Sequence, residues 1–577
     1  MNTIIQIFNL LGGLALFLYG MKAMSDGLQK LAGSRLRQLL HKATSNRFSA
    51  TICGALITGV IQSSSATTVM VVGFASAGLL NLYQSLGVIF GANIGTTLTA
   101  WIVSLFGFKF DISLFALPVI AIGFFIQCFD RWPTFKRIGE TLLGFGILFF
   151  GLAIMKEVVP TDLTQHPQVV TFISKWAPTS LGHLLILITS GTILTIILQS
   201  SSAIMAMTLT CAAAGLLDFP TACALVLGEN IGTTVTANIA ALGTNATAHR
   251  AALGHTLFNM IGVLWAVAFF PHLIHLVDVL VPGNPSAPHP HLLTAVLPYH
   301  IAAFHTLFNV LNTLLLLPLL KQLSAFTYVL YPKSKREDDK MHELVYLPQR
   351  FMPTAELSFI AVRKEMQRML QLVLKMNDKL MYAFKTGNDK HFRQFIGTIC
   401  RYEQTTDILE HKINTYLTRL THGNLSRQAV AQSVTLFDVL TNIEHMADAA
   451  EKIARITDKF HVKDSFTVQD KEDFLQIAKL TKHILQRTSI VLIDFHPTEP
   501  AKIIFEAALR DERKLNTLRK TLLRQRRERI LSLPPDPDTV TAYADILSNF
   551  ELTGDYAIRS IEHLLLTRTE NALTMSR

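Results

Sequence analysis

No Asp, Glu, Lys or Arg occurs between residues 48 and 108, and most of that stretch is apolar. A water-soluble domain needs a charged surface, whereas a transmembrane helix needs roughly 20 apolar residues. These properties predict an all-α, polytopic membrane domain over residues 1–330. Full-length apolar runs lie near residues 4–24, 84–107, 110–128, 138–158, 220–243, 251–272 and 292–320.

The rest of the chain has the composition of a soluble domain. Residues 1–330 contain 14 Lys or Arg and 9 Asp or Glu, whereas residues 331–577 contain 38 and 33. The net charge of +10 is therefore divided evenly between the two parts, and we expect no nucleic-acid partner. The five cysteines show no paired spacing, so we predict neither a disulfide framework nor a CxxC metal site.

Two further apolar stretches, residues 48–80 and 180–217, are each interrupted by the tetrapeptide Gln-Ser-Ser-Ser. The limbs on either side hold roughly 13–18 residues, which is at or below the length that crosses a bilayer. We therefore predict two re-entrant helical hairpins with their breaks near the middle of the membrane. Irregular backbone is tolerated there only where it is buried in protein or lines a wet cavity.

The basic residues predict an orientation in the lipid bilayer. With the N-terminus outside and both hairpins non-crossing, eleven Lys or Arg of the membrane part fall inside and three fall outside. This distribution agrees with the positive-inside rule. The first hairpin then enters from the cytoplasm, the second enters from outside, and everything after residue 320 is cytoplasmic.

A block of two polar motifs occurs twice at an offset of 137 residues. Gln-Ser-Ser-Ser begins at Gln62 and Gln199, and G-x-N-I-G-T-T begins at Gly91 and Gly228. Inverted repeats with broken helices are typical of secondary transporters, whose binding site lies near the midplane. We predict such repeats at about 5–128 and 138–272, with an extra span at 292–320. Close helix packing explains small residues in these segments, but not Gln followed by three Ser at two breaks.

The chemistry of such a break indicates what it binds. A helix that resumes after the break presents free backbone N–H groups and the positive end of its dipole, which favour an anion. The preceding helix ends in free carbonyl groups, which together with Gln, Ser and Thr oxygens suit a hard cation such as Na⁺. Neither repeat core contains Lys or Arg, so dipoles and co-bound cations must neutralise the anion.

With these two motifs in two halves, residues 5–320 resemble the sodium/phosphate cotransporter family, namely the type II class and its bacterial relatives. The resemblance implies a non-enzymatic, sodium-coupled transporter of inorganic phosphate in the bacterial inner (plasma) membrane. It implies that substrate and ions are bound by Gln62, Ser63, Ser64, Ser65, Gln199, Ser200, Ser201 and Ser202. Second contributors are Asn93, Thr96, Thr97, Asn230, Thr233 and Thr234.

Two other polar features fall in the membrane part. Glu229 stands where the first copy of the block has Ala92. Acids inside membranes are usually functional, so Glu229 is a candidate cation or proton site, with a solvated helix end as an equal alternative. HTLFN occurs at His255–Asn259 and at His305–Asn309. We favour hydrogen bonds to neighbouring helices over a proton relay for these residues.

Beyond a charged linker at 331–353, residues 354–577 show amphipathic helical spacing. Breaks near 387, 424, 462, 496 and 535 predict six helices, or two sets of three. Two acidic pairs at i, i+4 spacing, which places both carboxylates on one face, are Glu403 with Asp407 and Glu444 with Asp448. Spacing alone favours a solvated face over a metal site.

This region resembles a PhoU-type domain, a fold of two three-helix bundles whose acidic motifs bind metal clusters. The resemblance implies a divalent metal at the four acids, a cytoplasmic regulatory role and a phosphate-signalling partner. In the second set, Glu551 and Asp555 keep the acidic spacing, but Asn516 replaces the acid that would follow Glu512.

Two other functions fit the same sequence. One is a membrane-anchored phosphate sensor, and the other is a cation-coupled transporter of a different oxyanion. A hydrolase with a serine nucleophile is disfavoured, because no G-x-S-x-G occurs and no His or Asp lies near either Gln-Ser-Ser-Ser.

Overall fold

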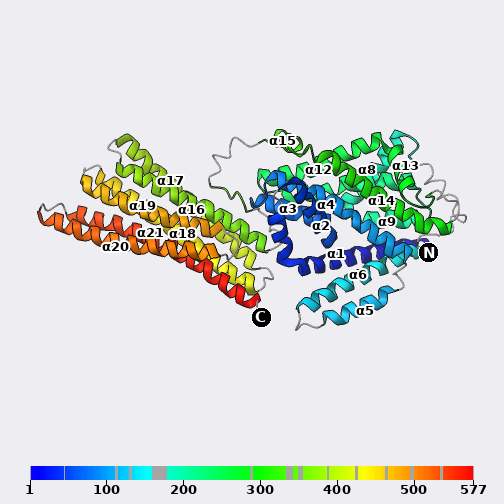
Figure 1. Cartoon of the computed structure of the whole chain (residues 1–577), viewed down its shortest axis with the longest axis horizontal. Helices are drawn as coiled ribbons and strands as arrows, with labels where there is room; N and C mark the ends of the chain where they lie inside the picture. The colour runs from blue at the N-terminus through cyan, green and yellow to red at the C-terminus, as the bar shows by residue number, and fades with distance from the viewer. Residues whose placement is uncertain are drawn as a thin grey trace. The chain divides into compact units, whose positions relative to one another are not determined.

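The computed structural model describes residues 2–43, 46–110, 115–128, 133–158, 178–285, 290–332, 342–347, 355–385, 389–422, 427–461, 465–493, 499–532 and 537–575. Contacts between Cα atoms divide the chain into two units, Met1–Lys333 and Ser334–Arg577. The described residues of both units are helical or irregular, without a strand. Figure 1 shows the helices and labels most of them.

The N-terminal unit carries the apolar segments of the sequence. Its elements are α1 (Asn2–Ala43), α2 (Arg47–Ile61), α3 (Ser64–Ser76), α4 (Leu82–Ile102), the π-helix η1 (Val103–Lys109), α5 (Ala116–Gln127), α6 (Pro133–Val158), α8 (Leu181–Leu198), α9 (Ser201–Ala213), α10 (Phe219–Gly232), α11 (Thr234–Ala241), α12 (Ala246–Ala268), α13 (Phe270–Leu280), α14 (Pro290–Leu316) and α15 (Leu320–Leu330). Helix α6 packs against both α1 and α5, as Figure 1 shows.

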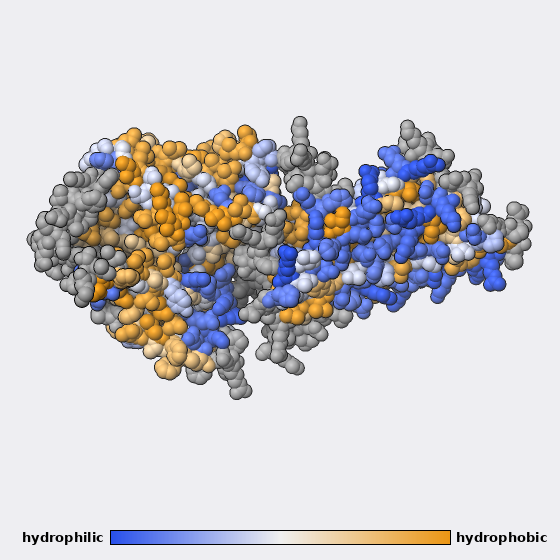
Figure 2. Space-filling model, turned by 180° about the vertical axis from the view of Figure 1, so that it is seen from behind, coloured by the Kyte–Doolittle hydropathy of each residue, from blue (hydrophilic) through white to orange (hydrophobic). Residues whose placement is uncertain are grey.

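This unit makes the chain an integral membrane protein. Among the described residues, four helices are long and apolar enough to cross a membrane: Leu82–Phe108, Thr134–Val158, Leu181–Leu198 and Ala246–Ala268. A fifth candidate is the pair Val296–Leu316 and Leu320–Leu330, which is bent by 83°. Figure 2 shows hydrophobic residues over much of this unit's visible surface and hydrophilic residues over the C-terminal unit. Exposed apolar area of this extent is what lipid covers.

The candidate spans agree only in part with the predicted ones. The runs at 84–107, 138–158, 251–272 and 292–320 fall largely within candidate spans, but the run at 110–128 corresponds to α5, which has 12 residues. The run at 220–243 is divided into α10 and α11 at Thr233. Helix α8, which we predicted as one limb of a hairpin, is itself long enough to cross.

Glycines bring the two motif helices of each copy into backbone contact. A Cβ atom added to Gly91 would lie 1.8 Å from the carbonyl oxygen of Thr51, and one added to Gly228 would lie 2.1 Å from that of Ile188. Both contacts leave no room for a side chain, so α4 packs on α2, and α10 packs on α8, through glycine. Gly54 and Gly191, also 137 residues apart, make the reciprocal contacts on α2 and α8.

The C-terminal unit contains the six helices that the sequence predicts. They are α16 (Ala355–Lys385), α17 (Asp389–Thr421), α18 (Arg427–His461), α19 (Val468–Ile493), α20 (Glu499–Ser532) and α21 (Pro537–Met575). Helices α16–α18 pack on one another, as do α19–α21, and the pairs α16 with α19 and α18 with α21 join the two sets. Of the predicted linker at 331–353, residues 331–332 and 342–347 lie within the described part.

Candidate functional site

Both Gln-Ser-Ser-Ser segments break a helix in the same way. Helix α2 is followed by Gln62, whose φ of 58° is left-handed, and α8 is followed by Gln199, whose φ is 50°. Among the described residues these are the only non-glycine residues with positive φ. The next residue, Ser63 or Ser200, caps the new helix by accepting a hydrogen bond on Oγ from the backbone three residues later, at 3.2 and 3.3 Å. Serine is among the best N-cap residues, so the sequence specifies both breaks locally.

The two new helices, α3 and α9, begin at one shared cavity. Their first residues, Ser64 and Ser201, both line it, and His305 of α14 contributes from a third direction. The space not filled by atoms is about 340 Å³, part of it open to solvent. None of the lining residues is Lys or Arg; they are Ser64, Asn93, Thr96, Thr99, Ala100, Ser201, Ser202, Met205, Glu229, Asn230, Thr233 and His305.

Half of the predicted site residues lie in this lining. They are Ser64, Asn93, Thr96, Ser201, Ser202, Asn230 and Thr233. The other seven predicted residues lie outside the lining: Gln62, Ser63, Ser65, Thr97, Gln199, Ser200 and Thr234. Thus the third residue of each Gln-Ser-Ser-Ser tetrapeptide, Ser64 or Ser201, lines the cavity, whereas the glutamine does not.

The two G-x-N-I-G-T-T segments orient their polar groups identically. The side-chain nitrogen of Asn93 donates to the carbonyl of Ile89 at 2.9 Å, and that of Asn230 donates to the carbonyl of Val226 at 2.8 Å. Thr96 and Thr233 each donate to the carbonyl four residues earlier, at 2.8 Å. Because these hydrogens are engaged within the helices, the amide and hydroxyl oxygens are left to act as acceptors or cation ligands.

The two glutamines have different surroundings. Gln62 is 6% exposed; its side-chain oxygen accepts a hydrogen bond from Thr99 Oγ1 at 3.1 Å, and its nitrogen donates to the carbonyl of Gly59. Gln199 is exposed. Thr236, the counterpart of Thr99, donates to the carbonyl of Thr233 at 2.8 Å and lies 3.5 Å from Ser65 Oγ. The sequence did not predict this asymmetry.

Glu229 is buried, which excludes the solvated helix end considered from the sequence. It is 2% exposed, and Thr208 Oγ1 donates to its Oε1 at 3.2 Å. The histidines of the two HTLFN motifs do not bond neighbouring helices through Nδ1, which has no hydrogen-bond partner in His255 or in His305. Asn259 and Asn309 instead donate to the histidine carbonyl of their own helix, at 3.1 and 3.0 Å. His305 is the one of these that reaches the cavity.

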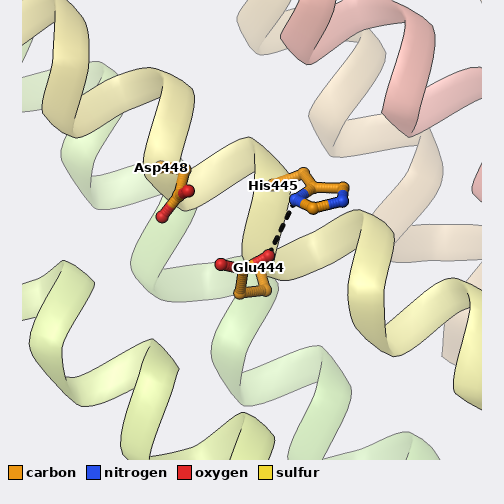
Figure 3. Close-up of side chains that lie close together, drawn as sticks. All are labelled: Glu444, His445 and Asp448. Atoms are coloured by element: carbon orange, nitrogen blue, oxygen red, sulfur yellow. Dashed lines mark ion pairs between the residues drawn. The ribbon is translucent and has the colours of Figure 1, made fainter.

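The C-terminal unit brings together the four acids that the sequence singled out. Carboxylate oxygens of Glu403, Asp407 and Asp448 lie within 4.8 Å of one another, between α17 and α18. Glu444, His445 and Asp448 form an overlapping group, drawn in Figure 3, in which His445 Nδ1 lies 2.8 Å from Glu444 Oε2. We did not predict His445 from the sequence, because we considered only acids at i, i+4 spacing and His445 lies between Glu444 and Asp448.

Crowding of like charges affects the titration of this cluster. Burial, followed by the charge of Asp407, raises the pKa of Glu403 to about 7. Burial, followed by the charge of Asp448, also raises the pKa of Glu444. A divalent cation with a preference for oxygen ligands would relieve this repulsion, so the residues fit such an ion. In the second set, Arg519 Nε lies 3.1 Å from Glu551 Oε2 and supplies a positive charge from the protein itself.

Comparison with protein families gives two matches. Residues 16–157 and 172–275 match the family described as Na⁺/Pi-cotransporter, and residues 366–457 match the PhoU domain. The first match contains both copies of the polar block, and the second contains the cluster of acids on α17 and α18.

Individual relatives extend these matches. "Putative inorganic phosphate export protein YjbB" of Escherichia coli K12 is 26% identical over 459 residues, which are 79% of each chain. "Uncharacterized protein YqeW" of Bacillus subtilis is 32% identical over 320 residues, 55% of this chain and 95% of that one. "Sodium-dependent phosphate transport protein 2A" of Rattus norvegicus is 34% identical over 107 residues, 18% of this chain and 17% of that one. No solved structure matches the chain.

Proposed function

Because this chain belongs to the Na⁺/Pi-cotransporter family and carries a PhoU domain, we propose that it transports inorganic phosphate across the membrane together with Na⁺. The observation that carries the proposal is the cavity at which α3 and α9 both begin. It contains hydroxyl and amide groups from both copies of the block and no Lys or Arg.

The phosphate would be held by the N-terminal ends of α3 and α9. The first turn of each helix has backbone N–H groups without partners in the helix, and each dipole places roughly half a positive charge at its N-terminus. Ser64 and Ser201 add hydroxyl donors at the same two ends. Two partial charges do not neutralise a phosphate dianion, so sodium ions bound by the remaining oxygens of Asn93, Thr96, Asn230 and Thr233 complete the balance.

We also propose that the two copies are inverted in the membrane, with the N-terminus outside and the C-terminal unit in the cytoplasm. The equal glycine contacts of α2 with α4 and of α8 with α10 support a common fold for the copies. Charge asymmetry supports the orientation. Labelling of single cysteines introduced at positions 46 and 180, the exposed residues that cap the starts of α2 and α8, tests the inversion in a chain without the five native cysteines. A membrane-impermeant reagent should reach position 46 from the cytoplasmic side and position 180 from the outside.

Flux of radiolabelled phosphate in proteoliposomes tests the transport function. We expect a sodium gradient to drive phosphate movement that a choline gradient of equal size does not drive. The assay is run with phosphate loaded inside and, separately, outside, because the names of the Escherichia coli relative and the Rattus norvegicus relative refer to export and to sodium dependence. Binding of phosphate without flux would favour the second candidate, a phosphate sensor, which the presence of the PhoU domain supports.

The C-terminal unit would regulate transport through a divalent metal held by Glu403, Asp407, Glu444 and Asp448. Because the pKa of Glu403 is raised in the folded state, the free energy of unfolding should fall as pH rises from about 4.5 to about 7 without metal. Added Mn²⁺ should reverse this fall by neutralising the carboxylates.

Hydrogen exchange of the full chain measures this effect locally. At pH 8, Mn²⁺ should slow amide exchange in α17 and α18 of the wild type and have little effect in Asp448→Asn. Glu562→Gln, which changes an exposed acid of α21, is the matched control and should respond as the wild type does. Equal protection by Mn²⁺ in Asp448→Asn would exclude these residues as the metal site.

A further inference from the structure

Glu229 is the feature of the cavity that a phosphate site does not explain. Its side chain lies on α10 and is 2% exposed, and the residue lines the cavity together with Ser64 and Ser201. The first copy of the block has Ala92 at this position. The second copy of the block therefore contributes an acid to the cavity at a position where the first copy has a neutral residue.

The surroundings of Glu229 do not neutralise it. The hydrogen bond that the structure gives to its carboxylate comes from Thr208, whose hydroxyl is neutral. Helix α10 packs against α8, α9, α11, α12 and α14. The titratable side chains described on these helices are His183 of α8, Cys211 of α9, His249, Arg250 and His255 of α12, and Tyr299, His300 and His305 of α14. None of them forms an ion pair with Glu229 within the described part of the chain, and His305 alone shares the cavity.

Arg250, the fixed positive charge among these groups, is engaged elsewhere. Its Nε donates to the carbonyl of Tyr331 at 3.0 Å, and its guanidinium lies 4.1 Å from the ring centroid of Tyr328. Nδ1 of His305 has no hydrogen-bond partner and its side chain is 5% exposed. The cavity thus contains one buried carboxylate and one buried imidazole nitrogen without a partner.

A buried carboxylate and a phosphate anion repel each other strongly when water does not separate them. Phosphate and Glu229 can occupy this cavity together only if the carboxylate has bound a cation. By thermodynamic linkage, a cation that must be present for phosphate to bind is itself bound more tightly when phosphate is present. Glu229 would then couple the two ligands, which neutral Ala92 cannot do.

We propose that Glu229 is the acceptor for one coupling cation, H⁺ or Na⁺, and that phosphate occupies the cavity only together with this cation. This inference rests on the proposed function and adds to it the residue that enforces coupling. Thr208 positions the carboxylate through its hydrogen bond. If the cation is H⁺, His305 in the same cavity can accept the proton and pass it on to Glu229. If it is Na⁺, the side-chain oxygens of Asn230 and Thr233 line the same cavity and can complete its coordination.

Equilibrium binding of radiolabelled phosphate to the purified full chain provides the test. One arm varies pH at fixed Na⁺, and the other varies Na⁺ at fixed pH. In the wild type we expect phosphate affinity to rise about 5–150-fold with the coupling cation, the usual range of coupling between sites. We plot the logarithm of phosphate affinity against the logarithm of the H⁺ or Na⁺ concentration. In Glu229→Gln, whose side chain is neutral and nearly isosteric, the slope of this plot should fall by about one in only one of the two arms.

The affected arm identifies the cation, because ionisation of phosphate itself is the same for both proteins. Glu229→Ala, which installs the residue of the first copy, should give the same change of slope and guards against an effect specific to Gln. Glu157→Gln is the matched control, because Glu157 is an exposed acid of α6 in the same unit. Its slopes should equal those of the wild type.

Two results would overturn the inference while leaving the proposed function intact. The first is that Glu229→Gln and Glu229→Ala both retain the wild-type slopes. The second is that both variants, although monodisperse and as heat-stable as the wild type, bind no phosphate at any cation concentration. A wild type that binds no phosphate would instead refute the proposed function, and the inference with it.

Discussion

The two copies of the polar block have the same backbone conformation at the helix break but differ in how far the glutamine at the break is buried. After α2 and after α8 the chain makes the same left-handed turn, with the same serine cap and the same glycine contacts to the following motif helix. Gln62 is nevertheless buried and accepts a hydrogen bond from Thr99, whereas Gln199 is exposed and Thr236 donates to the carbonyl of Thr233.

The motif helices of the two copies also differ in length. Helix α4 continues from Leu82 to Ile102, so that Thr99 follows the motif in an unbroken helix, whereas α10 ends at Gly232 and α11 begins at Thr234. An identical local signal therefore produces an identical break, but tertiary contacts decide how the break is covered. Variants made in matched pairs can separate these two contributions.

The largest effect is expected where the copies are alike. Ser64→Ala and Ser201→Ala should each lower phosphate flux roughly tenfold or more, because a hydrogen bond to a charged ligand contributes about 1.5–3 kcal/mol. Flux in proteoliposomes, normalised to the amount of folded protein, measures this. Ser190→Ala is the control, because Ser190 lies outside the cavity lining and bonds within α8 at 2.8 Å. Wild-type flux in either cavity variant would remove that helix end from the site.

The second pair tests the difference in stability. Gln62→Ala should lower the free energy of unfolding by about 1–3 kcal/mol, because it removes a buried side chain and leaves the hydroxyl of Thr99 without its acceptor. Gln199→Ala, at an exposed position with the same backbone conformation, should change it by no more than about 0.5 kcal/mol. Denaturant unfolding in detergent gives both values. Equal losses would mean that the second glutamine is covered as well as the first.

A double-mutant cycle isolates the hydrogen bond that only the first copy makes. Combining Gln62→Ala with Thr99→Val should give a coupling energy of about 1 kcal/mol, because the two side chains are in direct contact. The matched cycle with Gln199→Ala and Thr236→Val should give a value near zero. The same unfolding measurements supply both cycles, and a comparable coupling energy in the second copy would contradict the asymmetry.

The sequence predicts the parts of the molecule that local chemistry controls. The two helix breaks follow from residues at a fixed spacing, because serine caps a helix wherever it meets free N–H groups. The six C-terminal helices follow from amphipathic spacing interrupted by polar segments. The i, i+4 spacing places Glu403 with Asp407, and Glu444 with Asp448, on one face of each helix. Spacing alone favoured a solvated face for these acids, and only the resemblance to a PhoU-type domain implied that they meet, as their carboxylates do between α17 and α18.

The sequence fails where contacts between distant segments decide. Residues 220–243 form one apolar run, yet the helix is interrupted at Thr233. The local bond of Thr233 to the carbonyl of Glu229 does not explain this, because Thr96 makes the same bond within the unbroken helix α4. Gln199 is exposed although it belongs to the same tetrapeptide as buried Gln62. His305 reaches the cavity from α14, 103 residues after Ser202, and its spacing with Asn309 gave no sign of this position.

The smallest expected effect gives the sharpest contrast between the copies. A left-handed conformation costs a non-glycine residue about 1–2 kcal/mol, and glycine loses about 0.5–1 kcal/mol through its greater freedom in the unfolded chain. Gln199→Gly should therefore stabilise the protein by roughly 0.5–1 kcal/mol, since its side chain is exposed. Gln62→Gly relieves the same backbone strain but loses the contacts with Thr99 and Gly59, so it should give no net stabilisation.

Phosphate flux through Gln199→Gly then decides whether the second glutamine contacts the substrate. Gln199 lies outside the cavity lining, so flux should stay within about twofold of the wild type, less than the loss of one hydrogen bond would cause. A variant that unfolds less readily yet transports poorly cannot owe its defect to instability. Higher stability combined with poor transport in Gln199→Gly would show that Gln199 is part of the binding site. This glutamine would then reach the substrate in a conformation other than the one described.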